Sequence, residues 1–156
     1  MKTPAIFLIS GAVIMLILTS SFYMSHAQSS GEKSIQDTIV IYKDGVYDGQ
    51  SRDGYVDEPY WGKVRITIKD GMFAGIKFMI RDSNLHETFT KKYKKHYKGN
   101  PEYIQQVRND SKGVQIYPKI LLKTQDISKT DAVSGATWSY NIFRASAVEA
   151  LKKAEK

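Results

Sequence analysis

The chain has 156 residues, of which 42% are hydrophobic and 12% aromatic, and it contains no cysteine. This length suits one compact domain with its own core, whereas the lack of cysteine excludes disulfides, c-type haem attachment, cysteine-bound iron–sulfur clusters and thiol nucleophiles. Much of the formal net charge of +7 lies in one lysine-rich segment, and we expect no nucleic-acid partner, because no base-reading motif accompanies the charge.

The amino-terminal segment has the pattern of a signal peptide. Lys2 precedes an apolar run from Ala5 to Leu18, and small residues lead to Ala27, so we predict export and cleavage after Ala27. The run is shorter than the ~20 residues needed to span a bilayer. The alternative is an uncleaved anchor. We assign residues 1–27 to the signal peptide, 28–37 to a flexible linker and 38–156 to the folded domain.

Two β-hairpins are predicted at the start of the domain. The first lies in "TIVIYKDGVYDGQS", with a turn at Asp44-Gly45. In the second, apolar residues from Val64 to Ile68 alternate with polar ones, and Asp70-Gly71 turns the chain into a strand over 73–80. The alternation predicts a sheet with one buried face.

The pattern after residue 81 is helical. Asn100-Pro101 predicts the start of a helix that runs to about Asn109 and is ended or interrupted by Gly113, and Pro118 predicts the start of another short helix. The firmest helix begins at about Trp138, with lysines gathered at its carboxyl end. Hairpins followed by helices predict an α+β fold: an antiparallel sheet covered by carboxyl-terminal helices.

A lysine-rich segment precedes these helices, and we favour a solvated surface for it. The alternative is attraction to anionic polymer, lipid head groups or an acidic protein. Its basic residues are Lys91, Lys92, Lys94, Lys95, His96 and Lys98.

The stretch "DAVSGATWSY" admits two interpretations. Ser134 and Thr137 are residue types that commonly cap a helix amino terminus, and Gly135-Ala136 would only let the chain turn. Alternatively, the small residues leave the backbone approachable and the hydroxyl of Thr137 stands at the positive end of a helix, with Asp131 three residues before Ser134, which suits a phosphate.

The motif Asp131-x-x-Ser134-Gly135-Ala136-Thr137 resembles the flavinylation motif of the FMN-binding domain family. Relatives in that family include covalently flavinylated components of the sodium-translocating NADH:quinone reductase and of the Rnf complex. Further blocks, "DGVYDGQS", "GKVRITIKDGMFAGIKFMI" and "HETF", follow the family order. The resemblance therefore covers residues 38 to 154. Two features depart from the family: Trp138 replaces a frequent aliphatic residue, and a lysine-rich segment follows Glu87-Thr88 where many relatives have Pro-Gly.

The resemblance implies that Thr137 carries FMN through a phosphoester and that the protein is an electron-transfer carrier. It implies a separate flavin transferase that uses FAD and a metal ion, and this fits the lack of an obvious general base near Thr137 in the sequence. The donor would be a membrane respiratory complex and the acceptor would lie outside the cytoplasm. We predict no catalytic residue and no metal site in this chain, and the protein is more an electron carrier than a stand-alone enzyme. The alternative is a secreted module that binds FMN or another phosphate ligand non-covalently.

Further roles near the cofactor stay open. Asp131 would hold the motif loop through backbone amides or serve recognition by the transferase, and Trp138 would stack near the flavin or simply pack. Glu87 and Thr88 rank low as ligands, and His86 is an ordinary polar residue because no other ligands accompany it at metal-binding spacing. Sheet packing explains most of the amino-terminal aromatics, of which one or two could flank the flavin ring. These are Tyr42, Tyr47, Tyr55, Tyr60 and Trp61.

Overall fold

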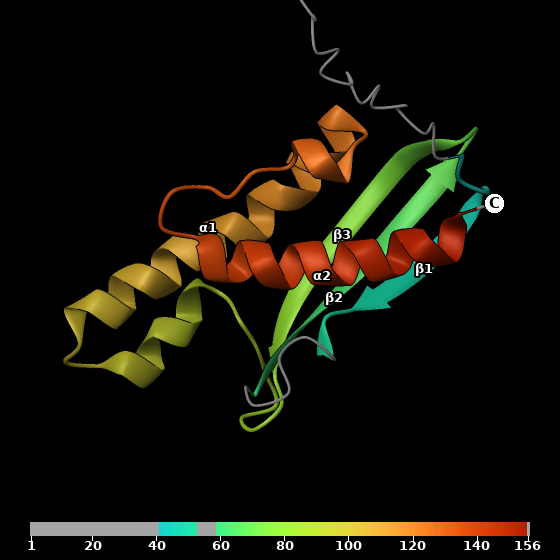
Figure 1. Ribbon diagram of the computed structural model, residues 1–156. Coiled ribbons are helices and arrows are strands. Elements are labelled where there is room, and N and C mark those ends of the chain that lie inside the picture. Colours follow the sequence, from blue (N-terminus) through green and yellow to red (C-terminus); the bar gives the residue numbers. More distant parts are fainter. Residues whose placement is uncertain (1–40, 53–58, 156) are drawn as a thin grey trace, which may run out of the picture. The chain divides into compact units, whose positions relative to one another are not determined.

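A computed structural model describes residues 41–52 and 59–155 (Figure 1). The predicted signal peptide, the predicted linker and Tyr55 lie outside the described residues. The amino-terminal half forms one antiparallel sheet and the carboxyl-terminal half is helical, which confirms the predicted α+β class. The strands are β1 (Gly45–Gln50), β2 (Tyr60–Lys69), β3 (Met72–Asp82) and β4 (Glu87–Thr88), and they lie in the sheet in this order.

The hairpin of β2 and β3 confirms the prediction made from the alternating pattern. Asp70 and Gly71 connect the strands with φ values of 54° and 73°, as a two-residue turn with left-handed geometry requires. The carboxylate of Asp44 accepts hydrogen bonds from both turn amides, at 2.8 and 2.9 Å. The buried face of β2 carries Val64, Ile66 and Ile68.

The first predicted hairpin is wrong in its pairing, although the chain bends at Asp44 and the second predicted strand forms as β1. Gly45 is the first residue of β1, which pairs with β2 from Gly45 opposite Ile68 to Gln50 opposite Lys63. The residues before it join the carboxyl terminus: Tyr42 bridges Glu155, and the amide of Lys43 donates to the carbonyl of Ala154 at 2.8 Å. The turn-like composition of this dipeptide therefore reflects the use of the Asp44 carboxylate at a different turn.

Helix α1 (Pro101–Thr124) is longer than predicted. It begins as expected, with Asn100 accepting a hydrogen bond from the amide of Tyr103 at 3.3 Å, but it continues through Gly113 and Pro118. A proline in a helix interior costs ~3 kcal/mol. The fully buried side chains of Tyr117 and Leu121 on either side of Pro118 offset this cost by packing against the sheet and against the last helix.

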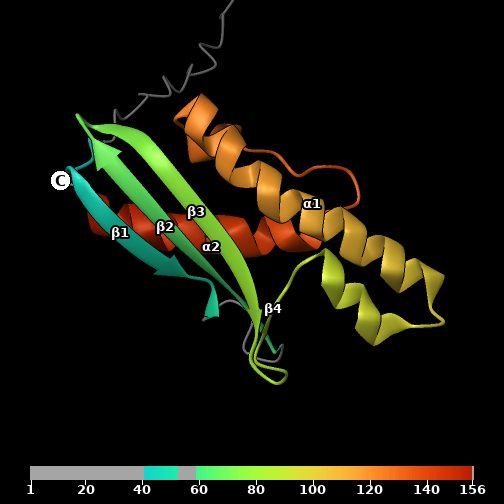
Figure 2. The same ribbon diagram turned by 180° about the vertical axis from the view of Figure 1, so that it is seen from behind.

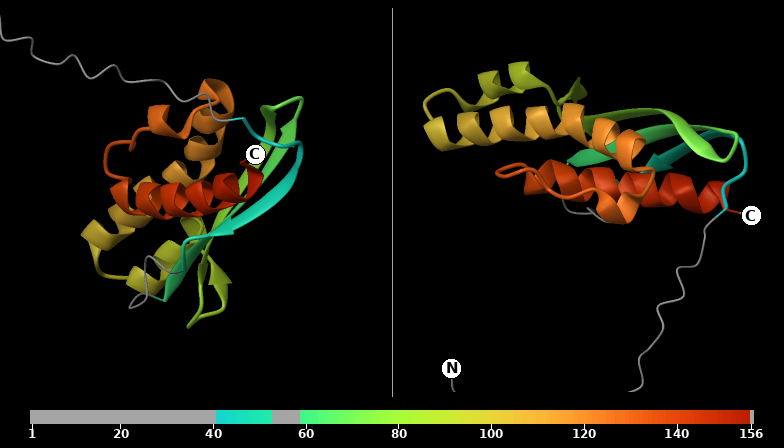
Figure 3. Two further views of the ribbon diagram at one scale, coloured as in Figure 1. Left: turned by 45° about the vertical axis from the view of Figure 1, so that its right-hand side comes forward. Right: turned by 90° about the horizontal axis from the view of Figure 1, so that it is seen from above.

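Helix α2 (Thr137–Ala154) matches the firmest helical prediction and lies across β1 and β2, while α1 packs against β3. Both helices cover the same face of the sheet, and no described helix covers the opposite face, as the views from the front and from behind show (Figures 1 and 2). The short 3-10 helix η2 (Lys91–Tyr97) lies along the amino-terminal half of α1, and η3 (Ile127–Lys129) follows α1 (Figure 3). The shared core contains Val64, Ile66, Ile68, Phe73, Tyr117, Leu121, Phe143, Ala147, Ala150 and Leu151.

Small residues bring α2 very close to the sheet. A Cβ atom on Gly49 would lie 2.0 Å from the carbonyl oxygen of Ser146, and one on Gly62 would lie 2.4 Å from a methyl group of Ile142. No other residue type fits at such distances. The same packing fixes the start of α2 relative to β2. No helix among the described residues is long and apolar enough to cross a membrane.

Candidate functional site

The motif loop forms a tight turn immediately before α2. The amide of Ala136 donates to the carbonyl of Val133 at 2.9 Å, and Gly135 at the third position of the turn has φ 73°. A β-turn with a positive φ at this position favours glycine. A Cβ atom on Gly135 would also lie 2.5 Å from Nδ2 of Asn109. Gly135 is therefore required by its backbone and by its neighbour.

Helix α1 holds this turn from behind. The hydroxyl of Tyr117, which is fully buried, donates to the carbonyl of Ala136 at 2.8 Å and accepts from the amide of Val133 at 3.2 Å. The side-chain amide of Gln106 donates to the carbonyl of Gly135 at 3.1 Å. Asp131 is exposed and makes no hydrogen bond or ion pair with the described residues. The loop is thus held by α1, and not by Asp131.

The start of α2 is capped by a carboxylate from α1. The N-cap residue is Ala136, which has no side-chain hydrogen bond to offer, so neither Ser134 nor Thr137 is the cap. Instead, Oδ1 of Asp110 accepts from the amide and the hydroxyl of Ser139, at 3.0 and 2.8 Å. Asp110 is 1% exposed. A charged acceptor at a helix amino terminus is favourable because it satisfies an unpaired amide and the helix dipole.

Thr137 is the first residue of α2, and its side chain is exposed, as are Ser134 and Gly135. Because Asp110 caps the helix, the hydroxyl of Thr137 is not needed for capping and faces solvent. Ala136 is fully buried behind it. The turn and the first residue of α2 thus present two exposed hydroxyls, those of Ser134 and Thr137, and that of Thr137 stands at the start of the helix.

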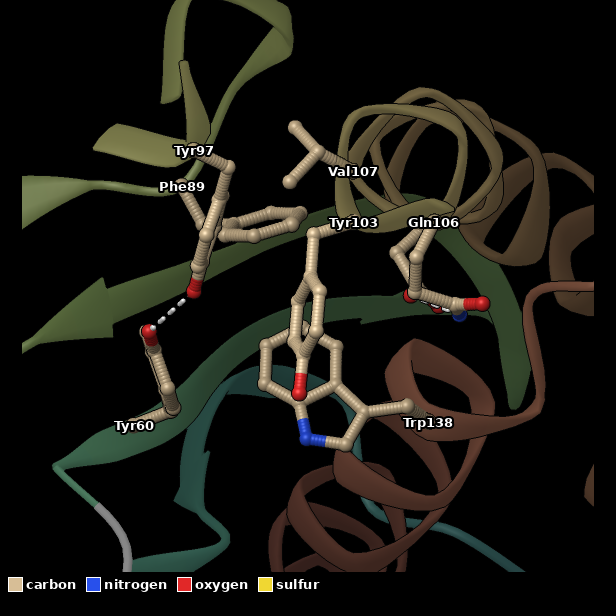
Figure 4. Close-up of a pocket in the computed structure, with 8 residues that line it drawn as sticks. Tyr60, Phe89, Tyr97, Tyr103, Gln106, Val107 and Trp138 are labelled. Atoms are coloured by element: carbon tan, nitrogen blue, oxygen red, sulfur yellow. Dashed lines mark hydrogen bonds between the residues drawn. The ribbon is translucent and has the colours of Figure 1, made fainter. Parts of the chain in front are cut away.

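An aromatic pocket of about 260 Å³ lies beside this turn, between α1, η2 and the start of α2 (Figure 4). Trp138, next to Thr137, forms one wall and packs on Tyr60 and Phe89, with ring centroids 5.1 Å apart in both pairs. Trp138 therefore packs and lines a pocket at once. The lining residues are Tyr60, Phe89, Tyr97, Tyr103, Gln106, Val107, Asp110 and Trp138.

A chain of hydrogen-bonded phenols runs from the sheet to this pocket. Tyr93 donates to the buried carboxylate of Asp82, the hydroxyls of Tyr93 and Tyr60 lie 3.0 Å apart, and those of Tyr60 and Tyr97 lie 3.3 Å apart. Burial, reinforced by the hydrogen bond with Tyr60, raises the pKa of Tyr97 to about 12. Burial and the hydrogen bond to Asp82 likewise raise the pKa of Tyr93. Both phenols keep their protons at neutral pH.

A basic groove of about 370 Å³ lies between η2 and α1, on the other side of Asn109. Its cationic residues, Lys91, Lys94, Arg108 and Lys112, form no ion pair with the described residues. By contrast, Lys95 of the same segment is 2.7 Å from Glu87, which also contacts His96 at 3.1 Å. The lysine-rich segment is thus divided: part is neutralised locally, and part joins α1 to form the groove.

The remaining candidates lie away from the turn. Tyr47 packs at the edge of the main core, and Tyr42 packs on Phe73 at the opposite end of the sheet from the aromatic pocket. Among the aromatics singled out in the amino-terminal half that the structure describes, Tyr60 alone lines this pocket. His86 is exposed. Within the described residues, no group of three or more His, Asp or Glu side chains is placed to hold a metal ion.

Sequence reasoning missed the residues on α1 that build the site. Tyr103, Gln106, Asp110 and Tyr117 recur at helical spacing and face α2. The predicted helix ended near Asn109, whereas α1 runs to Thr124, so Asp110 and Tyr117 lay outside the predicted helix. Nothing in the sequence indicated that Asp110, 29 residues before Ser139, would cap α2.

No family model and no curated protein matches the sequence. Among solved structures, the fold is similar to that of the CPE2226 protein from Clostridium perfringens, with a TM-score of 0.57. The two sequences are 24% identical, and the match covers 73% of this chain and 89% of the other. At this identity, the similarity concerns the fold alone.

Proposed function

We propose that this chain is an exported flavoprotein that carries FMN through a phosphoester on Thr137 and transfers electrons. The observation that carries the proposal is the exposed hydroxyl of Thr137 on a turn held by Tyr117 and Gln106, directly beside an aromatic pocket. A phosphate on this hydroxyl would lie at the amino terminus of α2, and an aromatic pocket suits a planar ring. The motif resemblance supports the same assignment.

The attachment reaction has a simple balance. The Thr137 oxygen bonds to the phosphorus of the FMN half of FAD, the diphosphate bridge breaks, and AMP leaves with the bridging oxygen. The hydroxyl proton needs a base. Because Asp110 already binds Ser139 and Gln106, we expect the transferase to supply that base together with its metal ion.

The residues of this chain would hold and orient the cofactor. Trp138, Phe89 and Tyr97 offer aromatic rings, and the exposed turn at Ser134 and Gly135 leaves the side of the phosphate open to solvent. Bound FMN would supply the redox chemistry. Electrons would come from a membrane respiratory donor and pass to an acceptor outside the cytoplasm.

Co-expression with a flavin transferase tests the attachment. We expect wild-type protein to gain the mass of one FMN less one water and to stay yellow after denaturation. Thr137→Val, which keeps the shape of the side chain and removes the hydroxyl, should gain nothing. Ser128→Ala removes another exposed hydroxyl, on η3, and should be modified like the wild type. Modification of Thr137→Val would contradict the proposal.

A second candidate is reversible binding of FMN in the same pocket, which the pocket's size and aromatic lining favour. In that case the colour would be lost on unfolding and Thr137→Val would still bind flavin. The denaturation step of the same experiment separates the two functions.

A further inference from the structure

The phenols at the polar edge of the aromatic pocket all donate their hydrogen bonds in one direction, towards the carboxylate of Asp82. This carboxyl is 3% exposed and accepts hydrogen bonds from Tyr93 and from the amides of Asn84 and Leu85, the latter at 2.8 and 3.0 Å. Burial opposes its ionisation, but these bonds more than offset that effect, so the pKa of Asp82 lies below its usual value. Asp82 is therefore a carboxylate at neutral pH and can only accept.

Each phenol has a single hydroxyl proton, so the donor in one hydrogen bond fixes the donor in the next. Tyr93 uses its proton on Asp82, so the bond to Tyr60 requires the Tyr60 hydroxyl to donate. The bond between Tyr60 and Tyr97 in turn requires the Tyr97 hydroxyl to donate. The oxygen of Tyr97 consequently offers the pocket only lone pairs.

Gln106 is held by neighbouring protein groups. Its Nε2 donates to Oδ2 of Asp110 at 2.5 Å and to the carbonyl of Gly135 at 3.1 Å, so both protons of its amide nitrogen are used. Figure 4 shows Tyr97 and Gln106 on opposite sides of the view, with aromatic rings between them and the Gln106 amide oxygen directed away from these rings. The pocket thus has one fixed acceptor, the oxygen of Tyr97.

We propose that this pocket binds a planar nitrogen heterocycle through an N–H group that donates to Tyr97. If that heterocycle is the isoalloxazine ring of FMN, the pocket binds the reduced ring more tightly than the oxidised ring. The second half rests on the proposed function. Reduction by two electrons and two protons converts the acceptor nitrogens N1 and N5 into N–H donors. The electrons come from the respiratory donor and the protons from solvent. A fixed acceptor favours the form with more donors.

The test uses lumiflavin, a free flavin ring without a phosphate, and the Thr137→Val protein. Binding of the oxidised ring and of the dithionite-reduced ring is measured by anaerobic equilibrium dialysis. We expect the reduced ring to bind about tenfold more tightly, as one added hydrogen bond of ~1.4 kcal/mol predicts. Equal binding of the two forms, tighter binding of the oxidised form, or no binding of either would overturn the inference.

Two variants separate hydrogen-bond direction from packing. Tyr97→Phe removes the acceptor and should bring the two affinities close together. Tyr60→Phe leaves Tyr97 without a partner for its proton, so Tyr97 can donate into the pocket, and the preference should reverse towards the oxidised ring. Tyr140→Phe removes a half-buried phenol outside this pocket and should keep the wild-type ratio. An unchanged ratio in Tyr60→Phe, in protein that remains folded, would refute the proposed direction.

The outcome does not depend on covalent attachment, because lumiflavin cannot be esterified. A preference for reduced lumiflavin in a protein that never acquires FMN would overturn the proposed function alone. Covalent FMN on Thr137 with no such preference would overturn this inference alone. In flavinylated protein, a tenfold loss of preference in Tyr97→Phe would lower the two-electron midpoint potential by ~30 mV.

Discussion

Gly135 is the residue in the motif where a single methyl group should have the largest effect. Its φ of 73° strains any side chain, and a Cβ atom would lie 2.5 Å from Asn109. We expect Gly135→Ala to lower the free energy of unfolding by ~2 kcal/mol and to slow flavin attachment, because the turn that presents Thr137 must shift. Urea unfolding and the rate of mass gain with transferase measure the two effects.

Gly99 supplies the matched control for that variant. It has φ 86° with nothing within 4 Å of a Cβ position, so Gly99→Ala has the strain without the clash. It should cost ~1 kcal/mol and leave attachment unchanged. Truncating the neighbour, as in Gly135→Ala combined with Asn109→Ala, should restore part of the stability. Equal losses in the two single variants would show that Asn109 does not constrain the turn.

Asp82 gives the folded state a dependence on acid. Its pKa is lowered in the folded protein by the hydrogen bonds that outweigh burial, with a smaller contribution from His96. The stability that it provides is present above ~pH 4, the ordinary pKa of aspartate, and is lost as pH falls through the lower folded value. Urea unfolding between pH 7 and pH 2.5 should show this loss, and Asp82→Asn should be less stable at pH 7 with a shallower acid dependence.

At the scale of elements, the edge of β3 is closed by a side chain. β4 pairs only with Arg81 and Asp82 at one end of β3. At the other end, the side-chain amide of Gln125 accepts from the amide of Phe73 at 2.7 Å and donates to its carbonyl at 3.0 Å. Gln125 therefore imitates a neighbouring strand for one residue and ties the end of α1 to the sheet.

Removing that amide should both loosen α1 and expose the edge. We expect Gln125→Ala to cost ~1 to 2 kcal/mol and to increase hydrogen exchange at Phe73. Gln125→Glu keeps the acceptor but loses the donor to the Phe73 carbonyl, so its stability should fall between those of Gln125→Ala and the wild type. If both variants match the wild type in denaturant unfolding, the contact does not contribute to stability.

The elements were predictable where their cause was local. The hairpin turn at Asp70-Gly71 and the start of α1 at Asn100-Pro101 follow from the residues themselves. The errors arose where a distant contact decides. Residue 113 in the middle of α1 is a glycine because a Cβ atom there would lie 2.6 Å from the hydroxyl of Ser139. Asp44 binds the amides of a turn 26 residues away. No local pattern records such contacts.

At the scale of the whole domain, the site joins segments that are far apart in sequence. The motif loop, α1, β2 and η2 meet at the aromatic pocket. The sequence motif identified the turn and Thr137 as a candidate, but not the pocket, because the pocket depends on how α1 crosses the start of α2. Asn109 and Gln106 contact the same residue of the turn, Gly135, and line the basic groove and the aromatic pocket respectively.

The basic groove is the place where the excess positive charge should act on an anionic surface. We expect binding to vesicles rich in phosphatidylglycerol to weaken with salt and to fall more than tenfold in Lys94→Glu combined with Lys112→Glu, since each lysine near such a surface contributes ~1 kcal/mol. Lys123→Glu combined with Lys69→Glu changes the charge equally at exposed sites outside the groove. Equal losses in the two double variants would assign the binding to net charge alone.

Peptide mapping tests the central claim that Thr137 carries the flavin. Trypsin releases residues 130–144 by cleavage after Lys129 and Arg144, and this peptide from the native host should carry FMN. Fragmentation should place the FMN on Thr137 and not on Ser134, the other exposed hydroxyl of the peptide. A peptide that is always unmodified, in cells with an active flavin transferase, or one modified at Ser134, would contradict the account.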